Sequence, residues 1–428
     1  MRVLILGSGA REHALGLVIS RSPQCSGIFF APGNPGTSRI GVNFDIEPTD
    51  FEAVANIIQT ETIQLVVVGP EGPLVEGISD YLKSKEYAFP VGVIGPDKAG
   101  AKLEGSKEFA KAFMQKYDIP TARYGSFSLS SITEGRAFLG SMSAPYVLKA
   151  DGLAAGKGVV ICNNPEEANA VLDDMLVHRR FGVASEKVVI EEFLNGIEIS
   201  MFVLTDGVSY LLLPEAKDYK RIGENDTGPN TGGMGAVSPV PFADAAFLAK
   251  VDQRIIKPTL IGLQKEGIPY CGFIFFGLMC VDGDPLVIEY NVRMGDPETE
   301  AILLRIESDF LSHLVATANG TLASESIRVS QSAAATIVIA SGGYPGEYET
   351  GFEVAGIQDI NKSEVFFAGL KGNPDLPVTM GGRVMAISSI ASNLQHAVAA
   401  SYESAKNIRF QNMYYRRDIG LDLMQFLP

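Results

Sequence analysis

The sequence predicts an α/β protein whose N-terminal part is an open parallel sheet. Short apolar runs alternate with amphipathic segments over the first hundred residues, which is typical of buried parallel strands joined by crossover helices. The first run leads directly into a glycine turn, as strand-to-helix turns do in such sheets. The chain has 428 residues, and because single domains usually hold about 100–200 residues, we expect several domains. The four apolar runs are residues 3–6, 28–30, 65–68 and 91–94.

The composition excludes several classes of protein. Hydrophobic residues make up 46% of the chain and charged residues 20%, which excludes intrinsic disorder. The 35 Lys and Arg against 50 Asp and Glu give a net charge of −15, the wrong sign for binding nucleic acid or an anionic membrane. No stretch approaches the ~20 apolar residues of a membrane span and no signal peptide opens the chain, so we expect a cytoplasmic protein. The four cysteines follow no metal-binding spacing and are expected to be free thiols.

The turn after the first strand predicts an anion site. It reads Gly7-Ser8-Gly9, but Glu12 stands where a dinucleotide fingerprint has its third glycine, and the second strand ends without a ribose-binding acid. A nicotinamide dehydrogenase is therefore disfavoured. Free N–H groups at a helix N-terminus still favour a phosphate, and Arg11 adds positive charge; the alternative is a turn that only joins strand to helix. The turns at 32–36 and 69–73 follow other strands of this sheet, so we expect all three at one rim.

A second α/β region follows a helical pattern at 103–117. Two short strands, at 146–149 and 158–161, flank a glycine-rich loop that follows Lys149 and contains Lys157. The loop lies between two strands and is one residue too short between its glycines, so it is not a P-loop. We expect a flap whose backbone N–H groups and lysines close over a polyphosphate; the alternative is a hairpin turn with a solvated lysine.

The next strand, at 188–194, ends in the string Glu191-Glu192-Phe193-Leu194, and Glu198 follows shortly after it. Backbone groups at the end of such a strand can bind the edge of an adenine while an acid binds the ribose hydroxyls. The alternative is a group of solvated acids at a strand end. The string at 226–235, rich in Gly and small polar residues, predicts a loop that presents backbone N–H groups to a ligand, with a flexible surface loop as the alternative.

The strand at 285–293 carries the most informative pattern. Glu289, Asn291 and Arg293 alternate at period two, so their side chains share one face of the sheet. A carboxylate beside an amide oxygen suits Mg²⁺, which takes one or two protein ligands and completes its shell with water and phosphates. Arg293 is placed to pair with an anion. The alternative is a solvated polar strand face.

Together these strings resemble the glycinamide ribonucleotide synthetase family, the phosphoribosylamine–glycine ligases of the ATP-grasp superfamily. They follow the family order over nearly the whole chain, and the string Thr-Gly-Pro-Asn-Thr-Gly-Gly-Met-Gly at 227–235 is highly specific. The residues that carry the resemblance are 7–15, 31–34, 68–71, 103–107, 149–158, 226–235, 289–298 and 417–420.

The resemblance implies three structural parts and one reaction. Residues 1–102 would form an N-terminal substrate-binding α/β domain, 103–327 an ATP-grasp core with a mobile lid at about 123–190, and 328–428 a small mixed α/β domain. The implied reaction joins glycine to 5-phosphoribosylamine through glycyl phosphate, giving glycinamide ribonucleotide, ADP and phosphate in de novo purine synthesis. Mg²⁺ or Mn²⁺ is the implied cofactor and ATP a co-substrate. The expected partners are these small molecules, with no nucleic acid and no membrane, and we expect a monomer or a weak homo-oligomer.

The resemblance also implies roles for individual residues. Catalysis would involve Arg293, Lys149 and Asp218, and the metal ligands would be Glu289 and Asn291. The ATP contacts would be Lys107, Lys149, Gly152, Gly156, Lys157, Gly158, Glu191, Glu192, Phe193, Leu194 and Glu198. The other substrates would contact Gly9, Glu71, Asn230, Thr231, Gly232, Gly233, Arg293 and Asp296.

The chain departs from the family pattern in three places. Lys217 and Tyr219 stand where many members have Gln and His, and Glu300 stands where many have Gln. The strand at 273–276 offers no upstream carboxylate as a third metal ligand. Two other functions are disfavoured: a ribonucleotide carboxylase of the same superfamily would lack the string at 226–235, and a catalytically silent nucleotide-binding protein would lack Glu289, Asn291 or Lys149.

Overall fold

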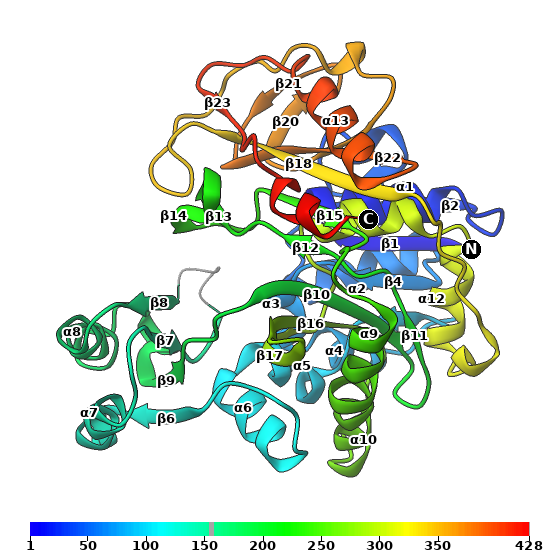
Figure 1. Cartoon of the computed structure of the whole chain (residues 1–428). Coiled ribbons are helices and arrows are strands. Elements are labelled where there is room, and N and C mark those ends of the chain that lie inside the picture. The colour runs from blue at the N-terminus through cyan, green and yellow to red at the C-terminus, as the bar shows by residue number, and fades with distance from the viewer. Residues whose placement is uncertain (154–157, 428) are drawn as a thin grey trace.

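Five parallel strands form the sheet at the N-terminal end of the chain (Figure 1). The computed structural model describes residues 1–153 and 158–427. The strand order is β3-β2-β1-β4-β5, and all four predicted apolar runs lie in strands of this sheet. The prediction of an open parallel sheet at the N-terminus is therefore confirmed. The strands are β1 (Arg2–Gly7), β2 (Gly27–Pro32), β3 (Val42–Asn43), β4 (Leu65–Val68) and β5 (Gly92–Ile94), and the helices are α1 (Ala10–Ser20), α2 (Phe51–Thr60), α3 (Glu71–Glu76) and α4 (Ile78–Lys83).

Two helices follow where the sequence predicts one at 103–117. They are α5 (Lys98–Gly105) and α6 (Lys107–Lys116). Ser106 separates them because its extended backbone ends α5, while its hydroxyl oxygen accepts a hydrogen bond from the amide of Phe109 at 3.1 Å and caps α6. The prediction of one continuous helix is therefore wrong, since a capping serine ends one helix and begins the next.

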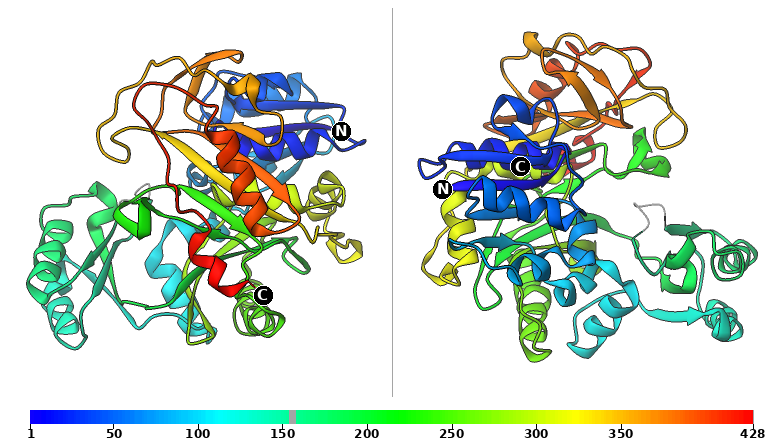
Figure 2. Two further views of the ribbon diagram at one scale, coloured as in Figure 1. Left: turned by 45° about the horizontal axis from the view of Figure 1, so that its top comes forward. Right: turned by 180° about the vertical axis from the view of Figure 1, so that it is seen from behind.

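Residues 124–192 form a unit with its own apolar core, set to one side of the molecule in both figures (Figures 1 and 2). Its antiparallel sheet has the order β6-β9-β7-β8, and the two strands predicted around the glycine-rich loop are β7 and β8. Because its core includes no residue of the remaining described chain, this unit, which corresponds to the predicted lid and keeps that name below, packs as a separate body. Its elements are β6 (Tyr124–Ser128), α7 (Ile132–Gly140), β7 (Tyr146–Ala150), β8 (Val159–Cys162), α8 (Pro165–Leu176) and β9 (Lys187–Glu192).

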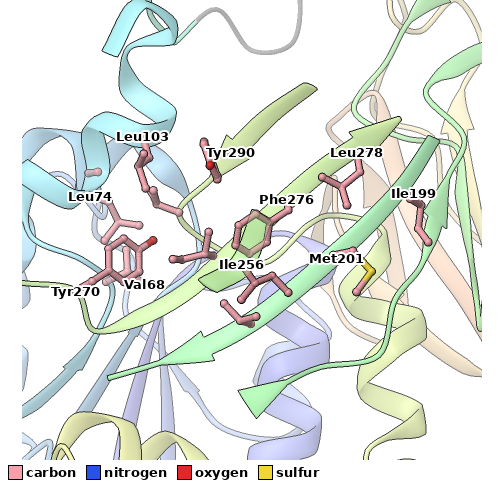
Figure 3. Packing of buried hydrophobic residues seen from close by; sticks show 14 of the residues in the cluster. Val68, Leu74, Leu103, Ile199, Met201, Ile256, Tyr270, Phe276, Leu278 and Tyr290 are labelled. Atoms are coloured by element: carbon pink, nitrogen blue, oxygen red, sulfur yellow. The ribbon is translucent and has the colours of Figure 1, made fainter. Parts of the chain in front are cut away.

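The central antiparallel sheet has the order β11-β10-β16-β17 and packs against the N-terminal sheet and its helices. In Figure 3 the side chains of Phe276 and Tyr290 lie among those of Val68, Leu74 and Leu103, which belong to the N-terminal part. One continuous apolar core thus joins the two sheets into a single scaffold. The elements are β10 (Ile197–Thr205), β11 (Tyr210–Leu212), α9 (Ala245–Val251), α10 (Lys257–Lys265), β16 (Gly272–Val281), β17 (Asp284–Asn291), α11 (Glu298–Ile302) and α12 (Phe310–Ala318).

A further sheet, formed mainly by the C-terminal part of the chain, takes two strands from the middle of the chain. Its order is β12-β15-β18-β22-β19, and β23 also pairs with β18. β12 (Lys217–Asp218) and β15 (Gly235–Ser238) enclose the hairpin β13 (Arg221–Gly223) and β14 (Thr227–Asn230). The remaining elements are β18 (Ala333–Ser341), β19 (Glu364–Phe367), β20 (Leu370–Asn373), β21 (Leu376–Thr379), β22 (Arg383–Ala391), α13 (Leu394–Ala405) and β23 (Met413–Tyr414). Within residues 1–153 and 158–427, no helix has the length and apolar character needed to cross a membrane.

Candidate active site

The polar row on β17 faces away from the core. Tyr290 and Val292 are buried in the shared core, while Glu289, Asn291 and Arg293 point to the other side, and the guanidinium of Arg293 donates to Asn291 Oδ1 at 3.1 Å. The predicted alternation is therefore confirmed. The side chain of Glu289 is 38% exposed. Burial acts to raise the pKa of Glu289, but nearby lysines and Arg293 hold it below its usual value, so the group is ionised at neutral pH.

Two lysines predicted to bind ATP phosphates lie beside this row. Lys107 Nζ donates to the backbone oxygen of Gly152 at 3.0 Å, and Lys149 Nζ donates to that of Ile288 at 3.2 Å. Burial and the charge of Lys149 lower the pKa of Lys107, although Glu289 acts in the opposite direction. The structure therefore brings Lys107, Lys149 and Glu289 to one place between the lid and β17. Gly158 is buried at the start of β8, and the predicted contacts Gly156 and Lys157 lie outside the described residues.

The side chain of Glu191 binds two buried lysines. Its carboxylate is buried at the end of β9 and pairs with Lys149 at 2.9 Å and with Lys111 at 2.8 Å. Lys111 also donates to Thr121 Oγ1 at 2.7 Å. The Glu191 side chain is thus occupied by two lysines and does not face a ribose, because at this position of β9 it points inward toward α6. Sequence reasoning missed Lys111, whose place in a helical pattern gives no sign of this pairing.

The other residues after β9 lie closer to the surface. Glu192 Oε1 accepts a hydrogen bond from the amide of Arg123 at 2.8 Å. Phe193 is 39% exposed, and Leu194 is partly buried. Glu198 extends from β10 and pairs with Lys220 at 3.0 Å. An aromatic and an aliphatic side chain near an acid can enclose a base and a ribose.

Lys220 joins the two predicted binding regions. Its ammonium lies 3.0 Å from Glu198 and 3.8 Å from Glu289, and these acids with Asp218 hold its pKa far above the usual value against the effect of burial. Asp218 is buried, and burial together with Glu298 and Glu198 raises its pKa to about 8 although Lys220 acts to lower it. A carboxyl group with such a pKa can exchange a proton near neutral pH. The pairing of Lys220 with acids 22 and 69 positions away has no signal in the sequence.

Two acids hold the guanidinium of Arg293. Glu104 Oε1 accepts from it at 2.8 Å, and Glu71 Oε2 accepts at 3.3 Å. Burial raises the pKa of Glu104 to about 7 despite Arg293, and Glu71 adds to that rise. The pKa of Glu71 is lowered by Arg293 and Arg11, which outweigh its burial. Glu71 thus lies beside Arg293, and Glu104, which has no assigned role in the sequence pattern, also fixes the arginine.

Glu12 occupies the space where the three N-terminal turns meet. Its Oε2 accepts from the amide of Gly9 at 2.7 Å, and a side chain at Gly7 or Gly69 would collide with it. Asn34, in the turn at 32–36, donates to the backbone oxygen of Ser8 at 2.9 Å, so the three turns share a rim as expected. Arg11 is buried and pairs with Glu12 at 2.6 Å, and its charge also lowers the pKa of Glu71, so its action on a bound anion stays a prediction. The carboxylate of Glu12 already binds the helix terminus and neutralises the arginine.

The predicted substrate loop contacts the opposite end of the site. Arg383 pairs with Asp296 at 2.9 Å and donates to the backbone oxygen of Gly232 at 2.7 Å. Asp296 also lies beside Gly9, since a β-carbon built on Gly9 would be 3.4 Å from its carboxylate. The structure thus brings Gly9, Asp296 and the loop of Asn230, Thr231, Gly232 and Gly233 together. Arg383, missed by sequence reasoning, links them from β22.

Three family profiles match this chain. The phosphoribosylglycinamide synthetase N domain matches residues 1–104, the ATP-grasp (A) domain matches 105–299, and the C domain matches 334–422. The chain belongs to the phosphoribosylglycinamide synthetase family. The phosphoribosylamine–glycine ligase of Chlorobaculum tepidum is 44% identical, with 98% of this chain and 99% of that protein covered. The ligase of Vibrio vulnificus is 43% identical, with 98% of each covered.

Solved structures place this phosphoribosylglycinamide synthetase family member among ATP-grasp folds. The crystal structure of phosphoribosylamine–glycine ligase from Thermotoga maritima superposes with a TM-score of 0.85 at 36% identity, covering 98% of this chain and 100% of that one. A biotin carboxylase domain from Hydrogenobacter thermophilus superposes with a TM-score of 0.73 at 16% identity, covering 99% and 93%, and shows the fold alone. The predicted fold class and the family resemblance are confirmed.

Proposed function

We propose that the site between the lid and β17 joins glycine to 5-phosphoribosylamine through glycyl phosphate. The chain is an ATP-dependent ligase of purine biosynthesis by its family. The observation that carries the assignment of the site is the meeting of Lys107, Lys149 and the ionised Glu289 beside Arg293. Cations and a carboxylate at one point suit a polyphosphate bound with a divalent cation.

In the proposed reaction, a carboxylate oxygen of glycine attacks the γ-phosphorus of ATP, and ADP leaves. The sugar amine then attacks the carbonyl carbon of glycyl phosphate and forms the C–N bond. The C–O bond to the phosphate breaks, inorganic phosphate leaves with its electron pair, and the nitrogen loses one proton. Lys149 and Lys107 would neutralise phosphate charge, and Arg293, fixed by Glu104 and Glu71, would bind the carboxylate or the transferred group. Asp218, with a pKa of about 8, would accept or return a proton.

ATP would lie between the lid and the central sheet. Its phosphates would contact Lys107, Lys149, Gly152 and Gly158, with Gly156 and Lys157 proposed from the sequence alone. The adenine and ribose would lie near Glu192, Phe193, Leu194 and Glu198, with Glu191 contributing through its backbone because its side chain binds two lysines. Gly9, Glu71, Asp296 and the loop 230–233 would bind the phosphorylated sugar.

A divalent cation, Mg²⁺ or Mn²⁺, fits Glu289 and Asn291. The carboxylate of Glu289 is ionised, and its contact with Lys220, at 3.8 Å from Oε1, is longer than a hydrogen bond; Asn291 Oδ1 accepts one hydrogen bond, from Arg293 at 3.1 Å, and keeps a second lone pair, so both side chains can offer an oxygen to a hard cation. Among those same residues no three His, Cys, Asp or Glu gather at one point. The two protein oxygens would therefore share the cation with phosphate oxygens and water, and the cation would supply charge neutralisation when bound.

The proposed organisation is three parts, with boundaries near 102 and 327 and a lid at about 123–190. The lid, which has its own core, would close over ATP and exclude water from the acyl phosphate. We also propose a monomer or a weak homo-oligomer, located in the cytoplasm, where the substrates of purine synthesis are made.

Release of ADP tests the proposal. ADP should form only when ATP, glycine and freshly made phosphoribosylamine are all present, because the phosphoryl group goes to glycine and not to water. Glu289→Gln keeps the volume but removes the charge that binds the cation, so we expect a rate about 100-fold lower with the fold intact. Asn291→Asp keeps an oxygen ligand and should retain partial activity with a changed Mg²⁺ to Mn²⁺ preference. Full-rate ADP release from ATP alone would contradict the chemistry, and wild-type metal dependence in Glu289→Gln would exclude β17 from the metal site.

A further inference from the structure

The C-terminal segment 414–422 runs past the hairpin β13–β14 and along β12 and β15, as the red chain shows below β23 in Figure 1. It includes the string 417–420, which the sequence shares with the family. The proposed reaction assigns no role to this string. The same segment contacts Lys217 and Tyr219, where the chain departs from the family pattern. These contacts converge on the stretch that carries Asp218 and Lys220.

Arg416 makes the most deeply buried contact of this segment. Its side chain is 1% exposed, and its guanidinium donates to Asp226 Oδ1 at 2.7 Å and to the backbone oxygen of Arg221 at 3.0 Å. Asp418 holds the same guanidinium through two hydrogen bonds of 2.8 and 2.7 Å and accepts from the amide of Asn225 at 2.7 Å. A bidentate pair that also binds backbone fixes geometry as well as charge. The turn between β13 and β14 is therefore held by the C-terminal segment.

Tyr219 makes the second contact. Its hydroxyl donates to Asp422 Oδ1 at 2.5 Å and accepts from the amide of Gly420 at 2.9 Å. Lys217 pairs with Asp422 at 3.1 Å, and its ammonium lies 3.7 Å from the centre of the Tyr219 ring. Lys217 and Tyr219 thus act together on one acid, which gives a physical reason for both departures from the family pattern.

Lys220 lies between these two anchors. Tyr219 precedes it and Arg221 follows it, and the backbone oxygen of Lys220 accepts from the amide of Thr231 at 2.7 Å. The ammonium of Lys220 meanwhile reaches Glu198 and Glu289. A change at either anchor would therefore move both Lys220 and the proposed sugar-binding loop, because the three share one short stretch of backbone.

We infer that the C-terminal segment 414–422 positions Lys220, Asp218 and the loop 230–233 for the reaction, with Tyr219, Arg416 and Asp422 as positioning residues. This inference rests on the proposed function of those site residues. The contacts described above for the three positioning residues are all with other residues of the chain, so they would act through Lys220, Asp218 and the loop. Their effect should therefore fall first on the sugar amine and on the rate. ATP should be affected less, because its phosphate lysines lie on α6 and β7 and Lys220 reaches it only through Glu198, a proposed ribose contact.

The test varies each substrate in turn with Tyr219→Phe and Asp422→Asn. Tyr219→Phe removes the hydroxyl that binds both Asp422 and Gly420; Asp422 is partly exposed, so Asp422→Asn removes charge with little risk to folding. We expect kcat/KM for the sugar amine to fall about tenfold, with KM for ATP within about twofold of wild type. The matched control is Asp375→Asn. Asp375 is an exposed acid elsewhere in the C-terminal part and pairs with Arg39 of the N-terminal part, so this variant should behave as wild type.

A double variant, Lys217→Gln with Tyr219→His, installs the pair that many family members have and should recover most of the activity lost in Tyr219→Phe. The inference would be overturned if the melting temperatures fall while kcat/KM for the sugar amine and KM for ATP stay at the wild-type values. The segment would then only stabilise the fold. A double variant as slow as Tyr219→Phe would also oppose it. Wild-type enzyme assayed alongside separates the proposals: if it makes no glycinamide ribonucleotide, the proposed function fails instead.

Discussion

Glu300 illustrates how one residue can oppose the stability of the fold. It is fully buried on α11, and neither carboxylate oxygen has a hydrogen-bond partner within the described chain. Burial and Asp296 raise its pKa well above the usual value, although Arg383 and Arg11 act to lower it. The folded protein therefore keeps a proton that the unfolded chain releases above pH ~4.3, so the free energy of unfolding falls as the pH rises above that value.

Glu300→Gln should remove this dependence. The amide has nearly the same shape and no charge, so we expect the variant to be about 1–3 kcal/mol more stable at pH 7, with the gain shrinking toward pH 4. Urea unfolding at several pH values measures it. Glu403→Gln, on the exposed face of α13, is the control and should change stability by less than about 0.5 kcal/mol. A variant less stable than wild type at pH 7 would show that Glu300 is ionised and paired.

Individual site residues differed in how far the sequence predicts them. The alternation of Glu289, Asn291 and Arg293 is predicted because side-chain direction in a strand has a period of two. The inward direction of the Glu191 side chain is not predicted, because it depends on which face of β9 packs against α6. Arg383 and Glu104 are not predicted either, since their partners lie far away along the chain and only the fold brings them together.

At the scale of elements, α6, β7 and β9 are joined by the buried group of Lys111, Glu191 and Lys149. Glu191→Gln would leave two buried ammonium groups without their counter-charge. We expect a loss of about 3–5 kcal/mol in the free energy of unfolding and a raised KM for ATP, since Lys149 loses its anchor. Lys111→Met leaves Glu191 and Lys149 as a one-to-one pair and should cost less stability.

The chain offers a matched control for this prediction. Lys187 on β9 and Glu108 on α6 form an exposed pair between two of the same elements. Glu108→Gln should lower stability by no more than about 1 kcal/mol and leave KM for ATP unchanged. Equal effects of Glu191→Gln and Glu108→Gln would contradict a special role for the buried group. Chemical unfolding and initial rates at varied ATP give both quantities.

In the whole molecule, the sheets and cores combine segments that lie far apart in the sequence. The N-terminal and central sheets share one core, and the C-terminal sheet takes β12 and β15 from residues 217–238. The sequence predicts most strands, because apolar runs are local signals. It does not predict that β15 pairs with β18, about a hundred residues away, because pairing between distant strands leaves no local pattern.

This arrangement predicts which parts fold alone. A fragment of residues 328–428 lacks β15, so residues 334–337 of β18, a strand whose nine residues are all buried, would lose their partner on one edge. We expect this fragment to aggregate or to lack cooperative unfolding, because an open apolar edge pairs with other chains. A lid fragment of residues 122–194 keeps its four-stranded sheet, two helices and apolar core and should melt cooperatively. Circular dichroism during heating and size-exclusion chromatography decide between these outcomes; a monomeric, cooperatively melting 328–428 fragment would show that β15 is dispensable for the C-terminal sheet.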